Sequence, residues 1–355
     1  MKKLLSFVLV CCAIVSSLAG CGNQPKNEAT SPVEGSVDAS SASEQPLKGK
    51  KIGYICAGPD ELYAVNYETS KYFIEKAGGE VIYATSDYNE TTELDNMQNM
   101  IVAGCDAIIL NCVNSNTAKE TCKIANNEGV PLFCVCARPN GEYDYNGVVF
   151  DSWYNYGHVM GAYAAENWPD AVMITIDGML TQNPGILFRD GFMDGVEEAG
   201  LTRPVSLGDG GWSKDGGLQL TQDLIASGRD FDVLFCANEE EAAGAIQALQ
   251  EANITDKIVL SINGKEAGVK MIEDGTLTAT MSNPPTIQGD VIVQMVLAYF
   301  AGEEYCDYIE VYQDGVITKD TVSKAVPWDI EAYAAGREAN AFEWSLDYYG
   351  SLMNN

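Results

Sequence analysis

The sequence predicts an α/β protein made of two lobes, each built on a mainly parallel sheet with helices on both faces. Three observations predict it. The chain has 355 residues, which suits two domains of roughly 100–150 residues each. Short apolar runs rich in β-branched residues alternate with amphipathic stretches, as in a βαβα series. That series stops after residue 151 and starts again near residue 171.

The first series contains five candidate strands, at residues 51–57, 80–86, 106–112, 131–137 and 147–151. Helical patterns lie between them at 66–77 and 92–103. In the second of these, Leu94, Met97, Ile101 and Val102 recur at helical spacing. Strands separated by helices in this way favour a parallel sheet that is covered on both faces.

The second series has strands at residues 171–177, 232–238 and 257–263, with helices over 186–199, 217–227 and 239–251. Two similar α/β units imply two lobes with a cleft between them. In such sheets, ligands bind outside the carboxyl ends of the strands.

The N-terminus has the pattern of an export signal. Lys2 and Lys3 precede an apolar stretch over 4–15 that is too short to span a bilayer, and small residues lead into Cys21. This resembles the lipobox of bacterial lipoproteins, which implies a signal peptide over 1–20 and a lipid on the Cys21 thiol. Residues 21–49 are rich in Ser, Ala, Glu and Pro and read as a flexible tether. We expect an extracytoplasmic protein that is anchored to the cell membrane.

The chain is strongly acidic, with 51 Asp and Glu against 21 Lys and Arg. Removal of the leader takes away Lys2 and Lys3, so the balance becomes 51 against 19, a formal charge of −32. Nucleic acid is therefore an unsuitable partner. We interpret the acidity as a solvated surface.

Eleven cysteines and one histidine are present. Eight cysteines remain after Cys11, Cys12 and Cys21 are set aside, and most lie in apolar runs, so we expect buried free thiols. In PLFCVCARPNGEY (131–143), Cys134 and Cys136 are two apart in a predicted strand and should share one face with Leu132. The spacing fits no zinc motif. We expect no metal and no cofactor.

Polar and aromatic residues recur where the predicted strands end. They are Asp60, Glu61, Tyr63, Asp87, Arg138, Asp151, Trp153, Asn238, Glu239 and Asn263. Each alone would be an ordinary loop or cap residue. Together, aromatic faces with carboxylates, amides and a guanidinium suit a neutral polyhydroxylated ligand, which stacks on rings and needs both donors and acceptors.

Several segments resemble the ribose-binding-like group of type I periplasmic solute-binding proteins, which deliver sugars to ABC transporters. The resemblance covers about 51–319 and rests on KIGYICAGPDELY, DAIILNCVNSNTAKE, GVPLFCV, FCANEEEAAGAIQALQ and INGKEAG followed by DGTLTAT. It implies two Rossmann-like lobes joined by a three-crossing hinge that closes on the ligand.

The resemblance also implies ligand-binding positions. Asp60 or Glu61, Tyr63 and Asn238 match positions that contact the ligand in the family. Asn263 stands where an Asp is usual, and Asn283 stands where a Gln is usual.

Two positions depart from the family pattern. Arg138 matches a usual Asp-Arg pair only if one residue is inserted, and Phe188 replaces a usual Arg. Trp212 falls at a usual Trp that either lines the cleft or packs beneath it. Fewer guanidinium donors make a simple pentose or hexose less certain as the ligand.

The resemblance divides the chain into an N-terminal lobe, 50–152 plus 284–316, and a C-terminal lobe, 153–283 plus 317–355. The crossings are expected beside Trp153, at Asn283-Pro284-Pro285 and near 314–319.

The expected function is capture of a small solute, a sugar, by a monomer that delivers it to an ABC transporter permease. No dinucleotide-binding G-x-G-x-x-G, P-loop or G-x-S-x-G follows a predicted strand, and His158 lies in a helical stretch, so catalysis is not expected. Two alternatives stay open. The protein could sense a ligand for a membrane receptor, or the same cleft could bind a nucleoside, a furanosyl signal molecule or an amino sugar.

Overall fold

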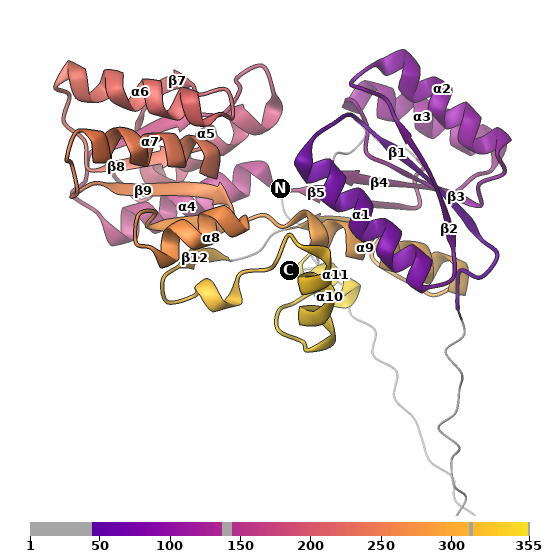
Figure 1. Ribbon diagram of the computed structural model, residues 1–355. Coiled ribbons are helices and arrows are strands. Elements are labelled where there is room, and N and C mark those ends of the chain that lie inside the picture. Colours follow the sequence, from indigo (N-terminus) through magenta and orange to yellow (C-terminus); the bar gives the residue numbers. More distant parts are fainter. Residues whose placement is uncertain (1–44, 137–143, 312–314, 354–355) are drawn as a thin grey trace, which may run out of the picture. The chain divides into compact units, whose positions relative to one another are not determined.

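The computed structural model describes residues 45–136, 144–311 and 315–353, which form two six-stranded sheets with helices on both faces (Figure 1). The first sheet has the strand order β11-β5-β4-β3-β1-β2, and all its neighbouring strands are parallel. Its strands are β1 (Lys51–Cys56), β2 (Glu80–Thr85), β3 (Ala107–Leu110), β4 (Leu132–Cys136), β5 (Gly147–Asp151) and β11 (Tyr308–Val311).

The second sheet repeats this plan in the order β12-β10-β9-β8-β6-β7, with one antiparallel pair, β12 against β10. Its strands are β6 (Met173–Asp177), β7 (Val205–Asp209), β8 (Val233–Cys236), β9 (Ile258–Asn263), β10 (Ala279–Ser282) and β12 (Val316–Thr318). In both sheets the strand order reverses next to the first strand of the series. At such a switch point, the loops after neighbouring strands diverge and leave a crevice.

Helices cover both faces of each sheet. On the first sheet, one core contains residues of α1 (Glu61–Lys76), α9 (Pro285–Ala301), α10 (Ile330–Glu338) and α11 (Leu346–Leu352). The opposite core contains residues of α2 (Glu90–Val102) and α3 (Ser115–Glu128). On the second sheet, α4 (Trp153–Asn167) and α5 (Asn183–Glu198) cover one face, while α6 (Lys214–Ser227), α7 (Glu239–Glu251) and α8 (Glu266–Glu273) cover the other. A short 3-10 turn spans Val322–Lys324.

Glycines allow α4 and α5 to pack backbone to backbone. A Cβ atom at Gly157 would lie 2.1 Å from the Phe188 carbonyl oxygen, and one at Gly161 would lie 2.2 Å from the Phe192 carbonyl oxygen. Gly195 on α5 approaches the His158 carbonyl oxygen in the same way, at 2.3 Å. No side chain fits at these positions, so the crossing fixes α5 and with it Phe188.

The predicted fold class is confirmed, and every strand predicted from the sequence is present within one or two residues. The placement of 317–355 in the second lobe is wrong for its last part. Tyr333, Leu346 and Tyr349 belong to the core between the first sheet, α1 and α9. After β12 the chain therefore passes back to the first sheet, because these large apolar side chains complete a core that α1 and α9 leave uncovered.

The cysteines are free thiols in the described part of the chain: seven are buried, and Cys306 is partly exposed. The expectation that Cys134 and Cys136 share one face is wrong. Cys134 packs in the core under α2 and α3, whereas Cys136 lies in the core under α1 and α9. Cys136 has φ of 65°, which breaks the alternation of an extended strand. Residues 137–143, which include Arg138, lie outside the described residues.

Candidate functional site

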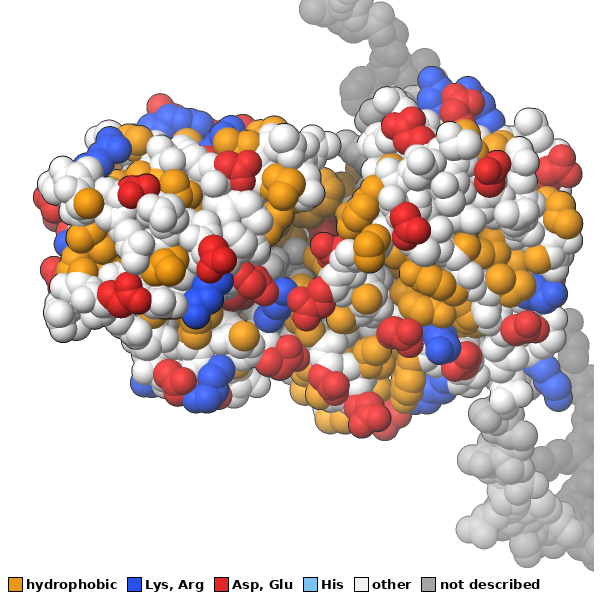
Figure 2. All heavy atoms as spheres, turned by 45° about the horizontal axis from the view of Figure 1, so that its top comes forward, with side chains coloured by type: hydrophobic (Ala, Val, Ile, Leu, Met, Phe, Trp, Pro, Cys, Tyr) orange, Lys and Arg blue, Asp and Glu red, His pale blue; other side chains and the backbone are white. Residues whose placement is uncertain are grey.

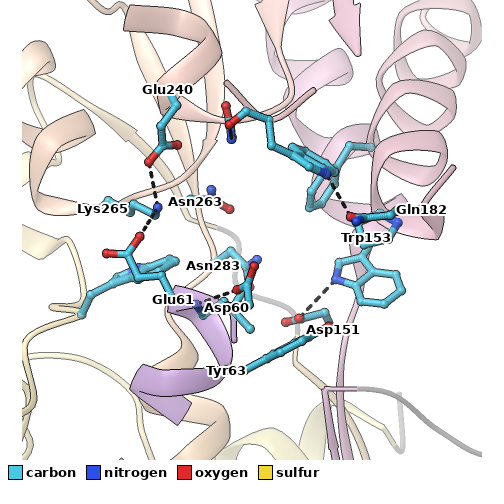
Figure 3. Close-up of a pocket in the computed structure, with 16 residues that line it drawn as sticks. Asp60, Glu61, Tyr63, Asp151, Trp153, Gln182, Glu240, Asn263, Lys265 and Asn283 are labelled. Atoms are coloured by element: carbon cyan, nitrogen blue, oxygen red, sulfur yellow. Dashed lines mark hydrogen bonds and ion pairs between the residues drawn. The ribbon is translucent and has the colours of Figure 1, made fainter. Parts of the chain in front are cut away.

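A pocket of about 310 Å³ opens where strands of both sheets end (Figure 3). Its lining comes from the loops that follow β1, β5, β6, β7, β8, β9 and β10, together with Trp328 from the segment that returns to the first sheet. The lining residues are Asp60, Glu61, Leu62, Tyr63, Asp151, Trp153, Gln182, Pro184, Phe188, Trp212, Asn238, Glu240, Asn263, Lys265, Asn283 and Trp328.

The structure brings the predicted site residues together in this one pocket. Those that line it are Asp60, Glu61, Tyr63, Asp151, Trp153, Phe188, Trp212, Asn238, Asn263 and Asn283. Two strand-end residues named above do not line it: Asp87 bonds to Thr85, and Glu239 lies beneath the site. Arg138, expected at the ligand, and Cys21, expected to carry the lipid, lie outside the described residues. A role for each lining residue in ligand binding stays a prediction.

The loop after β1 delivers three of these residues because Asp60 caps α1. Its carboxylate accepts a hydrogen bond from Leu62 N at 2.8 Å, which satisfies one of the unpaired amides of the first helical turn. The turn then presents Glu61 and Tyr63 to the pocket. Burial raises the pKa of Tyr63 well above its ordinary value, so this phenol stays neutral.

Glu241 clamps two walls of the pocket to each other. One carboxylate oxygen accepts from Trp212 N at 3.0 Å, and the other accepts from Ala237 N at 3.1 Å. Asn238, which caps α7 through Glu241 N, also donates its amide to the Trp212 carbonyl oxygen at 3.2 Å. Burial raises the pKa of Glu241 to about 9. The clamp fixes Trp212 and Asn238 side by side.

Trp212 lines the pocket, which decides between the two positions that the sequence left open. Its backbone is left-handed, with φ of 56°, and its indole N–H donates to the Gln182 side-chain oxygen at 2.9 Å. The ring meets Phe188 edge to face, with centroids 6.2 Å apart. Aromatic pairs of this kind form rigid walls.

Glu239 holds the loop that carries Asn263. Its Oε1 accepts from Gly264 N at 2.6 Å and from the Thr280 hydroxyl at 2.7 Å. Burial raises the pKa of Glu239 to about 8. Asn263 itself has φ of 126°, a conformation that favours glycine, so the loop depends on this anchor.

Asp151 lies at the end of β5 and is only 5% exposed. It accepts hydrogen bonds from the Trp153 indole N–H, at 3.2 Å, and from the Gln288 amide on α9. Both partners are neutral. Burial raises the pKa of Asp151 to about 7.

Sequence reasoning missed Leu62, Gln182, Pro184, Glu240, Lys265 and Trp328. Lys265 is the most informative of them, because its ammonium lies 2.6 Å from Glu61 and 2.9 Å from Glu240, over the Trp328 ring at 5.2 Å (Figure 3). The signal for Lys265 was its position two residues after a predicted strand end. Trp328 gave no such signal, because it reaches the pocket only where the chain returns to the first sheet.

The described residues contain no group of three or more His, Cys, Asp and Glu side chains placed to hold a metal ion. None of the helices in this part of the chain is both long and apolar enough to cross a membrane. On the face drawn in Figure 2, acidic side chains are scattered among neutral and hydrophobic ones. His158, which was not expected to be catalytic, pairs with Glu198 at 2.9 Å.

Comparison with protein families shows that the model described as "Periplasmic binding protein domain" matches residues 69–304. Among curated proteins, the ribose import binding protein RbsB of Salmonella typhimurium is 25% identical over 231 residues, which are 65% of this chain and 77% of the relative. The D-xylose-binding periplasmic protein of Escherichia coli is 26% identical over 244 residues, covering 65% of this chain and 73% of the relative.

Solved structures share the fold. A solute-binding protein of an ABC transporter from Bacillus halodurans, with bound myo-inositol, superposes with a TM-score of 0.67 at 23% identity and covers 78% of this chain and 96% of its own. The binding protein of an arabinose transporter from Shewanella, bound to L-arabinofuranose, gives a TM-score of 0.67 at 19% identity, with 82% and 97% covered.

Proposed function

Because the chain belongs to the periplasmic binding protein family, we propose that it is an extracytoplasmic solute-binding protein that captures a small polyhydroxylated ligand, a sugar, and delivers it to an ABC transporter permease. One observation carries the proposal. A single pocket gathers aromatic rings, amides and carboxylates from loops of both sheets. Such a lining suits sugar hydroxyls and C–H faces, and a ligand in it contacts both sheets at once.

The relatives support this ligand class, since their names refer to ribose and xylose. Delivery requires that the transporter distinguish the loaded form. We propose that the ligand stabilises a closed arrangement of two lobes, divided near residues 152 and 283 as the sequence suggests, with 330–352 returned to the first lobe.

The proposal includes a membrane anchor and a monomeric state. The lipobox-like residues before Cys21 support a lipid on its thiol, and the composition of 21–49 supports a flexible tether. A tethered monomer would stay close to a permease in the same membrane. A neighbouring receptor gene in place of transporter genes would instead favour the sensor alternative.

A binding role, not catalysis, fits the lining of the pocket. Three of its four carboxylates are held by structural bonds: Asp60 caps a helix, and Glu61 and Glu240 share Lys265. The relatives are likewise named as binding proteins.

A thermal-shift screen of the mature protein over sugars, cyclitols, nucleosides and amines tests the proposal. A ligand at a hundred times its Kd should add about 2.7 kcal/mol to the free energy of unfolding. The variant Asn263→Gly suits the backbone at this position and removes only the amide, so it should reduce the shift. Asn253→Gly is a matched control, because Asn253 also has a left-handed backbone, with φ of 56°, but lies outside the pocket. Stabilisation by nucleosides alone would refute the sugar assignment.

A further inference from the structure

Most of the strong donors of the pocket are already committed within the protein, and the exception is the Trp328 indole N–H, which is buried and has no partner among the described residues. The Trp153 indole N–H donates to Asp151 and the Trp212 indole N–H to Gln182. The ammonium of Lys265, the single basic residue among the described lining residues, lies between Glu61 and Glu240. Two carboxylates therefore compensate the charge of Lys265 before any ligand arrives.

Acceptors are in excess in the same lining. Four carboxylates line the pocket, those of Asp60, Glu61, Asp151 and Glu240. Two oxygens in the lining, Asn283 Oδ1 and Glu240 Oε2, are buried and have no hydrogen-bond partner in the described part of the chain. A buried acceptor without a partner costs free energy, so a ligand that brings donors is favoured.

Asp151 is the carboxylate of the lining that is buried without a positively charged partner among the described residues. It is buried against Trp153 and Gln288, both neutral, and no described basic side chain pairs with it. Buried charges in proteins are normally paired, or else the group takes up a proton. The position of Asp151 in the pocket lining allows a ligand to supply the missing positive charge.

Aromatic rings complete a site for a cation. Figure 3 shows Tyr63 and Trp153 next to Asp151, and Trp212 and Phe188 form a further wall of the pocket. The faces of such rings attract ammonium groups, most strongly where water is excluded.

We infer that the ligand of this pocket is a polyhydroxylated compound that carries one protonated amine, and that its ammonium group binds beside Asp151 between the rings of Tyr63 and Trp153. This inference rests on the proposed function and narrows its ligand class. The hydroxyl groups of the ligand then meet the amides of Asn238, Asn263 and Asn283.

A proton competes with the ligand for Asp151. The titratable groups that face this carboxyl are the Cys136 thiol on β4 and, across the pocket, Tyr63 and Asp60 at the start of α1. The side chain of Glu310 on the adjacent β11 bonds to Ser152 and Asn155 instead. Since the pKa of Asp151 is about 7, its ionised fraction rises about tenfold between pH 6 and pH 8. The affinity for an ammonium should rise by the same factor.

The test compares matched pairs that differ by one amine: D-glucose with 6-amino-6-deoxy-D-glucose, D-galactose with 6-amino-6-deoxy-D-galactose, and D-glucitol with D-glucamine. Each amine is on a methylene carbon and, like that of lysine, stays protonated through pH 8. Titration calorimetry of the mature protein at pH 6 and pH 8 gives the dissociation constants. We expect at least one aminated compound to bind at least tenfold more tightly than its parent at pH 8 and to lose most of that advantage at pH 6.

Asp151→Asn should abolish both the preference for the amine and its pH dependence. An asparagine can accept from Trp153 and, once the Gln288 side-chain amide turns over, donate to the Gln288 oxygen, so the unliganded melting temperature should stay close to that of the wild type. Asp95→Asn, an exposed acid on α2, is the matched control and should keep both effects. Equal or tighter binding of the parent sugars would overturn this inference and leave the proposed function intact. If no member of any pair binds, the inference fails, and the broader screen then decides on the proposed function.

Discussion

Lys265 Nζ lies 2.6 Å from Glu61 Oε2 and so joins the loop after β9 to the first turn of α1. The two residues are 204 positions apart in the chain and belong to opposite sheets. Glu240 holds the same ammonium from its own side at 2.9 Å. This ion pair therefore joins the two halves of the pocket directly, in addition to the chain segments that connect the two sheets.

A double-mutant cycle with Glu61→Gln and Lys265→Met measures that contact. The Glu61 side chain is 67% exposed, so the coupling should be about 0.5 kcal/mol in urea unfolding at low salt and near zero in about 1 M salt. The pair Glu68 and Lys71, at 3.8 Å on the surface of α1, is the control for a local surface pair and should show a coupling of no more than about 0.3 kcal/mol. Additive single mutants at low salt would contradict a direct contact.

Asn238 has a structural role as well as its expected role in binding. Its side chain caps α7 and bonds to the Trp212 carbonyl oxygen. Asn238→Ala should therefore lower the free energy of unfolding by about 1 kcal/mol as well as weaken ligand binding. Asn238→Asp keeps the cap but loses the amide donor, so it should weaken ligand binding with a smaller loss of stability. Equal unfolding midpoints for Ala and Asp in urea would argue against the cap.

The stability of the protein should fall as the pH rises from 5 to 8, in part because of Glu239. Its pKa is about 8 in the folded protein and 4.5 when unfolded, so the folded state holds a proton that the unfolded state releases above pH 4.5. That contribution is complete below pH 4.5 and is lost as the pH rises through 8.

Glu239→Gln should remove at least about 1 kcal/mol of this pH dependence in urea unfolding. The substitution keeps Oε1, which accepts from Gly264 N and Thr280, and replaces Oε2, which has no partner among the described residues. Glu273→Gln, exposed on α8, should leave the slope unchanged. If the free energy of unfolding of Glu239→Gln changed with pH as steeply as that of the wild type, Glu239 would not be a source of the pH dependence.

The crossing of α4 and α5 should tolerate no side chain at Gly161. A methyl group there would meet the Phe192 carbonyl oxygen, and separation of the helices would displace Phe188 from the pocket wall. Gly161→Ala should cost about 2 kcal/mol or more in spite of the better helix propensity of alanine. Glu166→Ala, exposed on the same helix, should change stability by less than about 0.5 kcal/mol. Thermal and urea unfolding of the two variants decide the point.

The parts of the fold and the site that could be predicted are those marked by a pattern in neighbouring residues of the sequence. Strand periodicity located β1, β8 and β9, and polar residues at their exits, such as Asn238 and Asn263, proved to line one pocket. Parallel strands force these exits to one edge of each sheet, which is why positions far apart in sequence could be grouped.

The unpredicted part depends on contacts between distant segments. Nothing near Lys265 indicates that Glu61 will be its partner, because the pair forms only when the two sheets face each other. The family resemblance assigns residues 330–352 to the second lobe with the rest of 317–355, and only the uncovered core of the first sheet explains their actual place. At Cys136 a left-handed backbone, which period-two reasoning cannot detect, reversed the expected face.

The return of α10 and α11 to the first sheet affects the order in which the two sheets can be completed when the chain is made from its N-terminus. Strands β6 to β10 are consecutive in the chain. Five of the six strands of the second sheet are therefore available as soon as the chain has been made up to residue 283. The core of the first sheet instead waits for Tyr333, Leu346 and Tyr349. During synthesis, the half that starts first is therefore finished last, and its incomplete core exposes apolar surface until these residues arrive.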